Sequence, residues 1–132
     1  VARFPDVTVV LDHNGGAPVQ EEEPAQPLLG NVLRLAQYPN TFVKLTPQPH
    51  RSQEPFPHPD TFPVYRRLYE TFGPERLMWG TNFPGVLRTI GYSRALELFR
   101  DHLDFLSAAD KEHIFATTPL RVWRFGAAGH QA

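Results

Sequence analysis

The chain has 132 residues, 41% of them hydrophobic and 20% charged, and a formal net charge of -1 at pH 7. This composition excludes a disordered chain. The net charge near zero, with acidic and basic residues interspersed, argues against nucleic acid or an anionic membrane as a partner, and the lack of a long apolar run argues against a membrane span. We expect one domain over residues 1–126 and a frayed tail at 127–132. The absence of cysteine fits a cytoplasmic protein. The start at Val1, close to a predicted strand, suggests a piece of a longer protein.

Three apolar segments predict strands. Residues 7–11 form a β-branched run without alternation, which is typical of a strand buried on both faces of a parallel sheet. Residues 41–46 and 76–81 predict the second and third strands, although Lys44 interrupts the second and must reach a partner or the rim of the sheet. The strand starts are 34 and 35 residues apart, a spacing that favours successive βα units with right-handed crossovers.

Helices are expected after each of the first two strands. Residues 28–38 carry a wide apolar face, and Pro39 ends it. Asp60 or Thr61 caps a second helix, whose apolar face runs to Phe72. The alternation of strand and helix predicts an α/β protein with a parallel sheet.

After the third strand the pattern predicts three more helices. The first covers about residues 93–106, and a capping box at residues 107–110 opens the second. Thr118 is expected as the N-cap of the last helix, which would pack Leu120 and Trp123 inward.

Candidate functional residues follow the three predicted strands. Because the carboxyl ends of parallel strands lie at one edge of a sheet, His13, Thr46 with the loop of His50 and Arg51, and Asn82 should converge there. His13 could act as a general acid or base, or polarise a substrate oxygen; the alternative is a histidine that serves only the turn. Asn82 could offer a carbonyl oxygen to a hard cation but cannot act as a base; the alternative is a residue that caps the turn.

Four segments together carry a resemblance to a known family: residues 12–18 (DHNGGAP), 38–45 (YPNTFVKL), 72–84 (FGPERLMWGTNFP) and 114–123 (IFATTPLRVW). Their order resembles that of the amidohydrolase superfamily, in the branch with 2-pyrone-4,6-dicarboxylate lactonase, sugar lactonases and aminocarboxymuconate-semialdehyde decarboxylase. The resemblance implies the last three parallel βα units of a (β/α)8 TIM barrel plus C-terminal helices, a fold that needs about 250 residues when complete. The metal-binding His-x-His of the first strand would lie upstream of Val1.

The resemblance also implies roles for single residues. Matched by position, His13 corresponds to the catalytic histidine of the sixth strand and Asn82 to an aspartate of the eighth. A divalent metal, zinc above all, is therefore implied for the complete protein, held weakly if Asn82 is a ligand. Resembling enzymes often act on carboxylates, for which His50, Arg51 and Arg88 are candidate binding groups; the alternative is ordinary surface charge.

The function that the resemblance implies is hydrolysis of a small carboxylate-bearing lactone or related carbonyl compound, with this chain incomplete as an enzyme. A non-oxidative decarboxylase on the same scaffold is the alternative within enzymes. A further alternative is an inactive half-barrel whose open sheet and apolar face associate with a partner or with a second copy of the chain.

Overall fold

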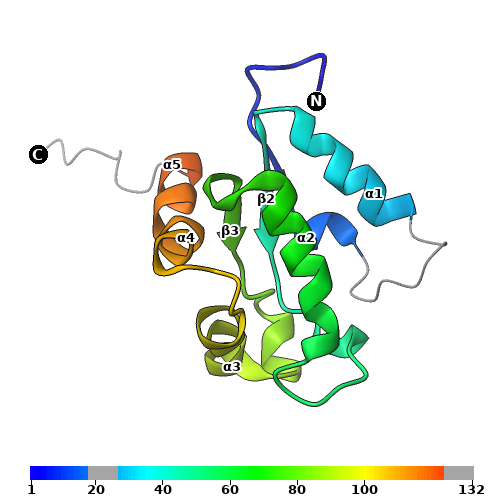
Figure 1. The fold of residues 1–132 in the computed structure, drawn as a ribbon, viewed down its shortest axis with the longest axis vertical. Coiled ribbons are helices and arrows are strands. Elements are labelled where there is room, and N and C mark those ends of the chain that lie inside the picture. Colours follow the sequence, from blue (N-terminus) through cyan, green and yellow to red (C-terminus); the bar gives the residue numbers. More distant parts are fainter. Residues whose placement is uncertain (18–26, 124–132) are drawn as a thin grey trace, which may run out of the picture.

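The sheet has three parallel strands. A computed structural model describes residues 1–17 and 27–123 and is shown in Figure 1, so the predicted tail at 127–132 lies outside the described residues. The strand order is β1-β2-β3, with β1 over Val9–Leu11, β2 over Thr41–Leu45 and β3 over Leu77–Trp79. Leu11 pairs with Val43, and Val43 with Leu77. The predicted α/β class and parallel order are confirmed, while the described strands form an open sheet and no closed barrel.

The described residues form five α-helices around this sheet: α1 (Pro27–Arg34), α2 (Phe62–Phe72), α3 (Gly91–Glu97), α4 (Ala108–Glu112) and α5 (Thr118–Trp123). Figure 1 shows α1 and α2 next to each other beside β2, while α4 and α5 lie on the side of β3. Among the described helices, none has the length and apolar character needed to cross a membrane.

The helix α2 packs as its sequence pattern predicts. Tyr65, Leu68 and Phe72 are buried in the core, and the Tyr65 ring lies 4.9 Å from that of Phe99, the latter in the turn of π-helix after α3. Full burial of one such side chain contributes about 1.5–3 kcal/mol, so this face is a main source of the stability that holds the sheet in place.

The C-terminal helices differ from the predicted ones. The capping box at Ser107 is confirmed, but α4 continues through a turn of π-helix, residues His113–Thr117, into α5, so Thr118 lies inside a helical run and is not an N-cap. Leu120 and Trp123 were predicted to pack inward and are about half exposed, at 52% and 50%. Ile114 and Thr118 are the buried residues of this run, and their four-residue spacing sets the inward face.

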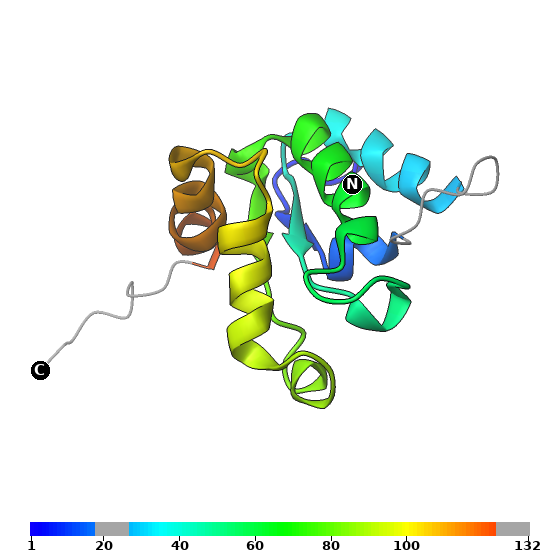
Figure 2. The same ribbon diagram turned by 60° about the horizontal axis from the view of Figure 1, so that its bottom comes forward.

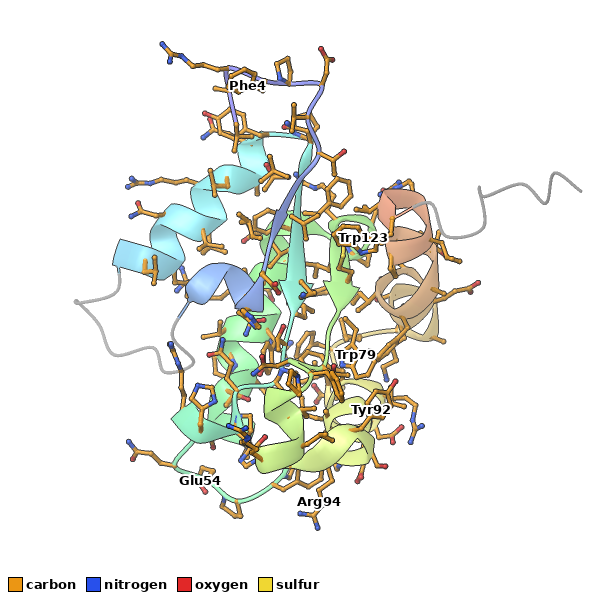
Figure 3. All side chains as sticks on the ribbon, turned by 180° about the vertical axis from the view of Figure 1, so that it is seen from behind. Phe4, Glu54, Trp79, Tyr92, Arg94 and Trp123 are labelled. Carbon is orange, nitrogen blue, oxygen red and sulfur yellow. The ribbon has the colours of Figure 1, made fainter. Side chains whose placement is uncertain are left out.

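Two further expectations about burial are wrong. The strand β1 is half-buried and Val7 is exposed, because β1 is an edge strand of the described sheet and lacks a neighbour on one side. Leu28 is also exposed, whereas Leu29 and Val32 carry the inward face of α1. The aromatic rings of Trp79 and Tyr92 lie edge to face with their centres 5.7 Å apart. Figure 3 labels both side chains, which lie near each other.

The side chain of Asn14 continues the sheet beyond the end of β1. Its Nδ2 donates to the Thr46 carbonyl oxygen at 3.0 Å, and its Oδ1 accepts from the Thr46 backbone N–H at 2.9 Å. Asn14 is fully buried with a φ of 57°, in the left-handed region that asparagine tolerates better than most residues. The carboxamide thus takes the place of a peptide group in the parallel ladder.

We predict that Asn14→Ala lowers the free energy of unfolding by about 2–4 kcal/mol, because it leaves the buried N–H and C=O of Thr46 without these partners. Urea denaturation followed by circular dichroism measures the change. Asn31→Ala, on an exposed position of α1, is the matched control and should change stability by less than about 0.5 kcal/mol. Equal effects of the two substitutions would contradict the assignment.

Candidate functional site

The segments that follow the three strands meet at one end of the sheet. Figure 2 brings this end forward and shows the turn after β1 and the loop after β2 near the segment that leads from β3 into α3. A pocket of about 230 Å³ lies between these segments; its lining residues are His13, Gly16, Thr46, Gln48, His50, Arg51 and Asn82. The pocket therefore contains four of the five predicted site residues.

His13 begins the turn that leaves β1. Its φ is 49°, a left-handed value that is uncommon for a residue with a Cβ atom. The backbone N–H of His13 donates to the Asp12 carboxylate at 2.9 Å, and Gln48 Nε2 donates to the His13 carbonyl oxygen at 3.4 Å. The imidazole is about half exposed, at 48%, and faces the pocket, where it can reach a ligand.

The turn needs glycine directly after Asn14. Gly15 has a φ of 68°, and a Cβ atom there would lie 2.7 Å from the Val32 side chain of α1. Both the backbone conformation and the close approach of the helix therefore exclude a larger residue. The close neighbour of the backbone at Gly15 is therefore the helix α1.

Asn82 leaves β3 in the left-handed region, with a φ of 62°. The turn that follows is capped by its neighbour, because the Phe83 N–H donates to Thr81 Oγ1 at 3.1 Å. Asn82 contributes its backbone carbonyl, which accepts from the Val86 N–H at 3.0 Å. Its carboxamide makes no hydrogen bond to a described residue and lines the pocket, so it is available to a ligand.

His50 and Arg51 belong to a turn of 3-10 helix, Pro49–Arg51, and both are exposed. Neither side chain has a hydrogen bond or an ion pair with any residue that the structure describes. Among the residues that the structure describes, the Arg51 guanidinium is thus a cationic group at the pocket without an acidic partner. Arg88, the third candidate for binding a carboxylate, lies in the exposed turn Gly85–Arg88 and is not among the lining residues.

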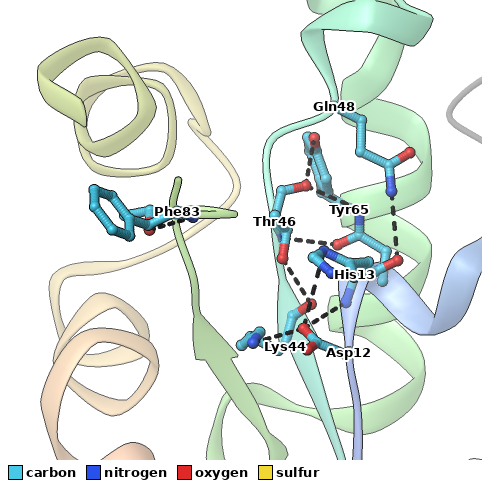
Figure 4. A network of polar contacts seen from close by, with 9 residues as sticks. Asp12, His13, Lys44, Thr46, Gln48, Tyr65 and Phe83 are labelled. Atoms are coloured by element: carbon cyan, nitrogen blue, oxygen red, sulfur yellow. Dashed lines mark hydrogen bonds and ion pairs between the residues drawn. The ribbon is translucent and has the colours of Figure 1, made fainter. Parts of the chain in front are cut away.

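Lys44 reaches a partner, as its position within β2 requires. Its Nζ lies 2.6 Å from Asp12 Oδ1 at the end of β1, and Figure 4 shows this pair beside His13. Burial raises the pKa of Asp12, but the hydrogen bond and charge of Lys44, together with His13, outweigh burial and hold the pKa below the usual 3.8. Asp12 therefore stays ionised near neutral pH.

Sequence reasoning did not assign a role to Thr46 or Gln48, which also line the pocket. Thr46 is fully buried, and its carbonyl oxygen accepts from both Asn14 Nδ2 and, at 3.3 Å, the Tyr65 hydroxyl. Gln48 is 6% exposed, and its Oε1 has no hydrogen-bond partner among the described residues. A glutamine in a proline-rich loop carries no pattern that distinguishes it from a solvated one, so only the tertiary structure reveals its burial.

A larger cavity, of about 510 Å³, lies at the opposite end of the strands, among residues that precede β2 and β3. Its two arginines are already engaged: Arg76 donates to the carbonyls of Phe72, Ala36 and Tyr38, and Arg121 to that of Glu75. Since these cations bind backbone, the smaller pocket is the better candidate for a ligand site, because its Arg51 is unpaired within residues 1–17 and 27–123.

A metal site is not complete in this part of the molecule. In residues 1–17 and 27–123, no three side chains of histidine, aspartate or glutamate lie close enough together to hold a metal ion. At the pocket, His13 and Asn82 could contribute one imidazole nitrogen and one neutral carbonyl oxygen. Two such donors fall short of the three protein ligands that catalytic zinc usually has.

Known proteins resemble this chain over most of its length. The family model for amidohydrolase matches residues 1–125. An L-fucono-1,5-lactonase from Burkholderia ambifaria is 31% identical over 93 residues, which make up 68% of this chain and 30% of the lactonase. A crystal structure of a zinc-bound amidohydrolase from Burkholderia multivorans is 25% identical, with a TM-score of 0.79 over 93% of this chain and 46% of that one.

A candidate 2-pyrone-4,6-dicarboxylic acid hydrolase from Pseudomonas putida, 23% identical with a TM-score of 0.74 over 92% of this chain and 44% of that one, shares the fold. The chain thus spans less than half the length of these three relatives. The resemblance predicted from the four motifs is confirmed, and with the family match over all but the last seven residues, the chain belongs to the amidohydrolase family.

Proposed function

We propose that the protein, when its sheet is completed by the remaining strands of a barrel, hydrolyses a small lactone that carries a carboxylate. The observation that carries this proposal is the pocket at the carboxyl ends of the strands, where His13, Arg51 and Asn82 converge. The L-fucono-1,5-lactonase from Burkholderia ambifaria supports the reaction class, because it is 31% identical to this chain over 93 residues.

In this reaction a water molecule attacks the carbonyl carbon of the lactone, and the ring C–O bond breaks to leave a hydroxy acid. His13 is the imidazole of the pocket that the resemblance matches to a histidine of the sixth barrel strand, and it can accept the proton of the attacking water and return it to the leaving alkoxide. Asn82 cannot accept this proton, and we propose that its carboxamide orients the ligand by hydrogen bonding. The proton transfer therefore falls to His13 or to a group outside this chain.

Arg51 is proposed to bind the carboxylate of the substrate. Its guanidinium has no acidic partner among the described residues, and it can offer two parallel N–H donors to a carboxylate, which gives both affinity and orientation. His50 precedes it in the same turn and lines the same wall of the pocket, so we propose that it contacts the same end of the substrate.

The proposed active site requires further strands that the described sheet does not contain. Both β1 and β3 have one side without a hydrogen-bonded strand in the described sheet, and the chain spans 46% of the zinc-bound relative. Open sheet edges pair readily with further strands. We therefore propose that a segment or a partner with the remaining barrel strands covers this sheet and supplies the metal ligands that the described residues lack.

We predict that Arg51→Met weakens binding of a carboxylate-bearing lactone such as 2-pyrone-4,6-dicarboxylate to the 132-residue chain by about tenfold, because a charge-assisted pair is lost. Chemical-shift titration by NMR measures the dissociation constant. Arg3→Met, at an exposed arginine of the N-terminus, is the control, and Arg88→Met separates the two arginine candidates. Equal weakening by Arg3→Met would show that only net charge matters.

Hydrolysis itself is tested in a chimera that joins the upstream part of the Burkholderia ambifaria lactonase to this chain. We predict ring opening of an aldonolactone, and a kcat that falls by about 100-fold to 10,000-fold in His13→Gln because the proton acceptor is lost. The control is His113→Gln, on the helical run after α4. Release of carbon dioxide without ring opening would overturn the hydrolase in favour of a decarboxylase.

We predict that Asn82→Asp raises the affinity of the same chimera for zinc, since a carboxylate adds a full negative charge to a neutral donor position. Competition against a chromogenic chelator measures the affinity of both forms. Asn31→Asp, on the exposed face of α1, controls for the added charge. If both asparagines have the same effect, or neither has any, Asn82 does not face the metal.

A further inference from the structure

Lys44 and Asp12 are neighbours across the two strands. The strand register pairs Leu11 with Val43, which places Asp12 opposite Lys44 one residue further along. The ion pair of 2.6 Å therefore joins residues at the same level of the sheet, one position before His13 and two positions before Thr46, both of which line the pocket. The Lys44 side chain is 29% exposed and that of Asp12 is 54% exposed, so water reaches the carboxylate more readily than the ammonium.

The Lys44 side chain packs against the backbone of Gly80, which has no Cβ atom to block it. A Cβ atom at Gly80 would lie 2.7 Å from Cδ and 2.8 Å from Cγ of Lys44, distances that real contacts do not show. The aliphatic stem of the lysine thus lies directly on the backbone after β3 while its ammonium reaches the end of β1. One side chain in this way links the ends of all three strands.

The Asp12 carboxylate has two possible partners besides Lys44, both on His13. Its Oδ1 accepts from the His13 backbone N–H at 2.9 Å and lies 3.9 Å from the imidazole Nδ1. The first contact stabilises the left-handed backbone of His13, with its φ of 49°. The second contact, if it shortened, would draw the imidazole away from the pocket toward Asp12.

We propose that Lys44 is a positioning residue for His13, which acts by holding the Asp12 carboxylate on the His13 backbone N–H so that the imidazole stays free for a ligand. The inference rests on the role of His13 proposed above. Figure 4 shows the three side chains together, with the ion pair and the backbone contact drawn.

The test is the solvent exchange rate of the His13 amide proton, measured by NMR on the 132-residue chain. We expect Lys44→Met to speed this exchange by about tenfold, because the carboxylate that accepts the proton is no longer held, and Lys44→Arg to stay within about threefold of the original chain. Lys111→Met removes the only other lysine of the chain and should leave the rate unchanged.

Amides of the sheet show whether the role is only structural. The N–H groups of Val43 and Leu45 should keep their exchange rates in Lys44→Met. A uniform increase across the sheet, or an unchanged rate at His13, would overturn the proposal.

Two variants keep the test decisive if Lys44→Met fails to fold. Asp12→Asn, at an exposed side chain, keeps an acceptor oxygen but loses the charge that Lys44 holds, so it should speed His13 exchange as much as Lys44→Met does. Gly80→Ala should do the same by displacing the lysine stem. If neither variant changes the rate at His13, the proposal is wrong.

The exchange rate is read on His13 itself and does not depend on hydrolysis. An inactive chimera with the expected exchange pattern would therefore overturn the lactonase proposal alone. An active chimera, together with a His13 amide exchange rate that does not change in Lys44→Met, would overturn the positioning role alone.

Discussion

The hydrogen bonds between the Asn14 carboxamide and the Thr46 backbone hold the ends of β1 and β2 together at the level where the pocket begins. Without them, the buried N–H of Thr46 at the carboxyl end of β2 would lack its partner and the Thr46 carbonyl would keep only the Tyr65 hydroxyl, a cost that a small sheet tolerates poorly. Because Asn14 adopts a left-handed conformation to make these bonds, the chain turns sharply after β1. The position of His13, one residue earlier, follows from that turn.

The charges around the pocket divide into a balanced pair and a free group. Lys44 is matched by Asp12, while Arg51 has no acidic partner in the described part of the chain. Asn82 adds polarity without charge. Among the described residues the unbalanced charge at the pocket is thus positive, which favours an anionic ligand. The described arginines of the larger cavity at the other end bind carbonyls instead.

Local sequence patterns predicted the positions of strands and helices better than they predicted which face of each is buried. The three strands, the helix before Phe72 and the capping box at Ser107 are local features, and the structure confirms them. The last helix was predicted with the wrong inward face, because a π-helical turn joins it to α4 and makes Ile114 and Thr118 the buried positions. Because the helical run continues from α4 through the π-helical turn into α5, the run does not begin at Thr118, although a threonine followed by a proline is a usual helix start.

The sequence by itself determined the order of the strands, the edge of the sheet where His13, Arg51 and Asn82 lie, and the family, since these depend on apolar runs and motifs read along the chain. Only the tertiary structure decided that Arg51 lines the pocket while Arg88 does not, and that Asn14 and Lys44 join neighbouring strands. Such contacts depend on strand register and loop conformation, because they join residues more than 30 positions apart.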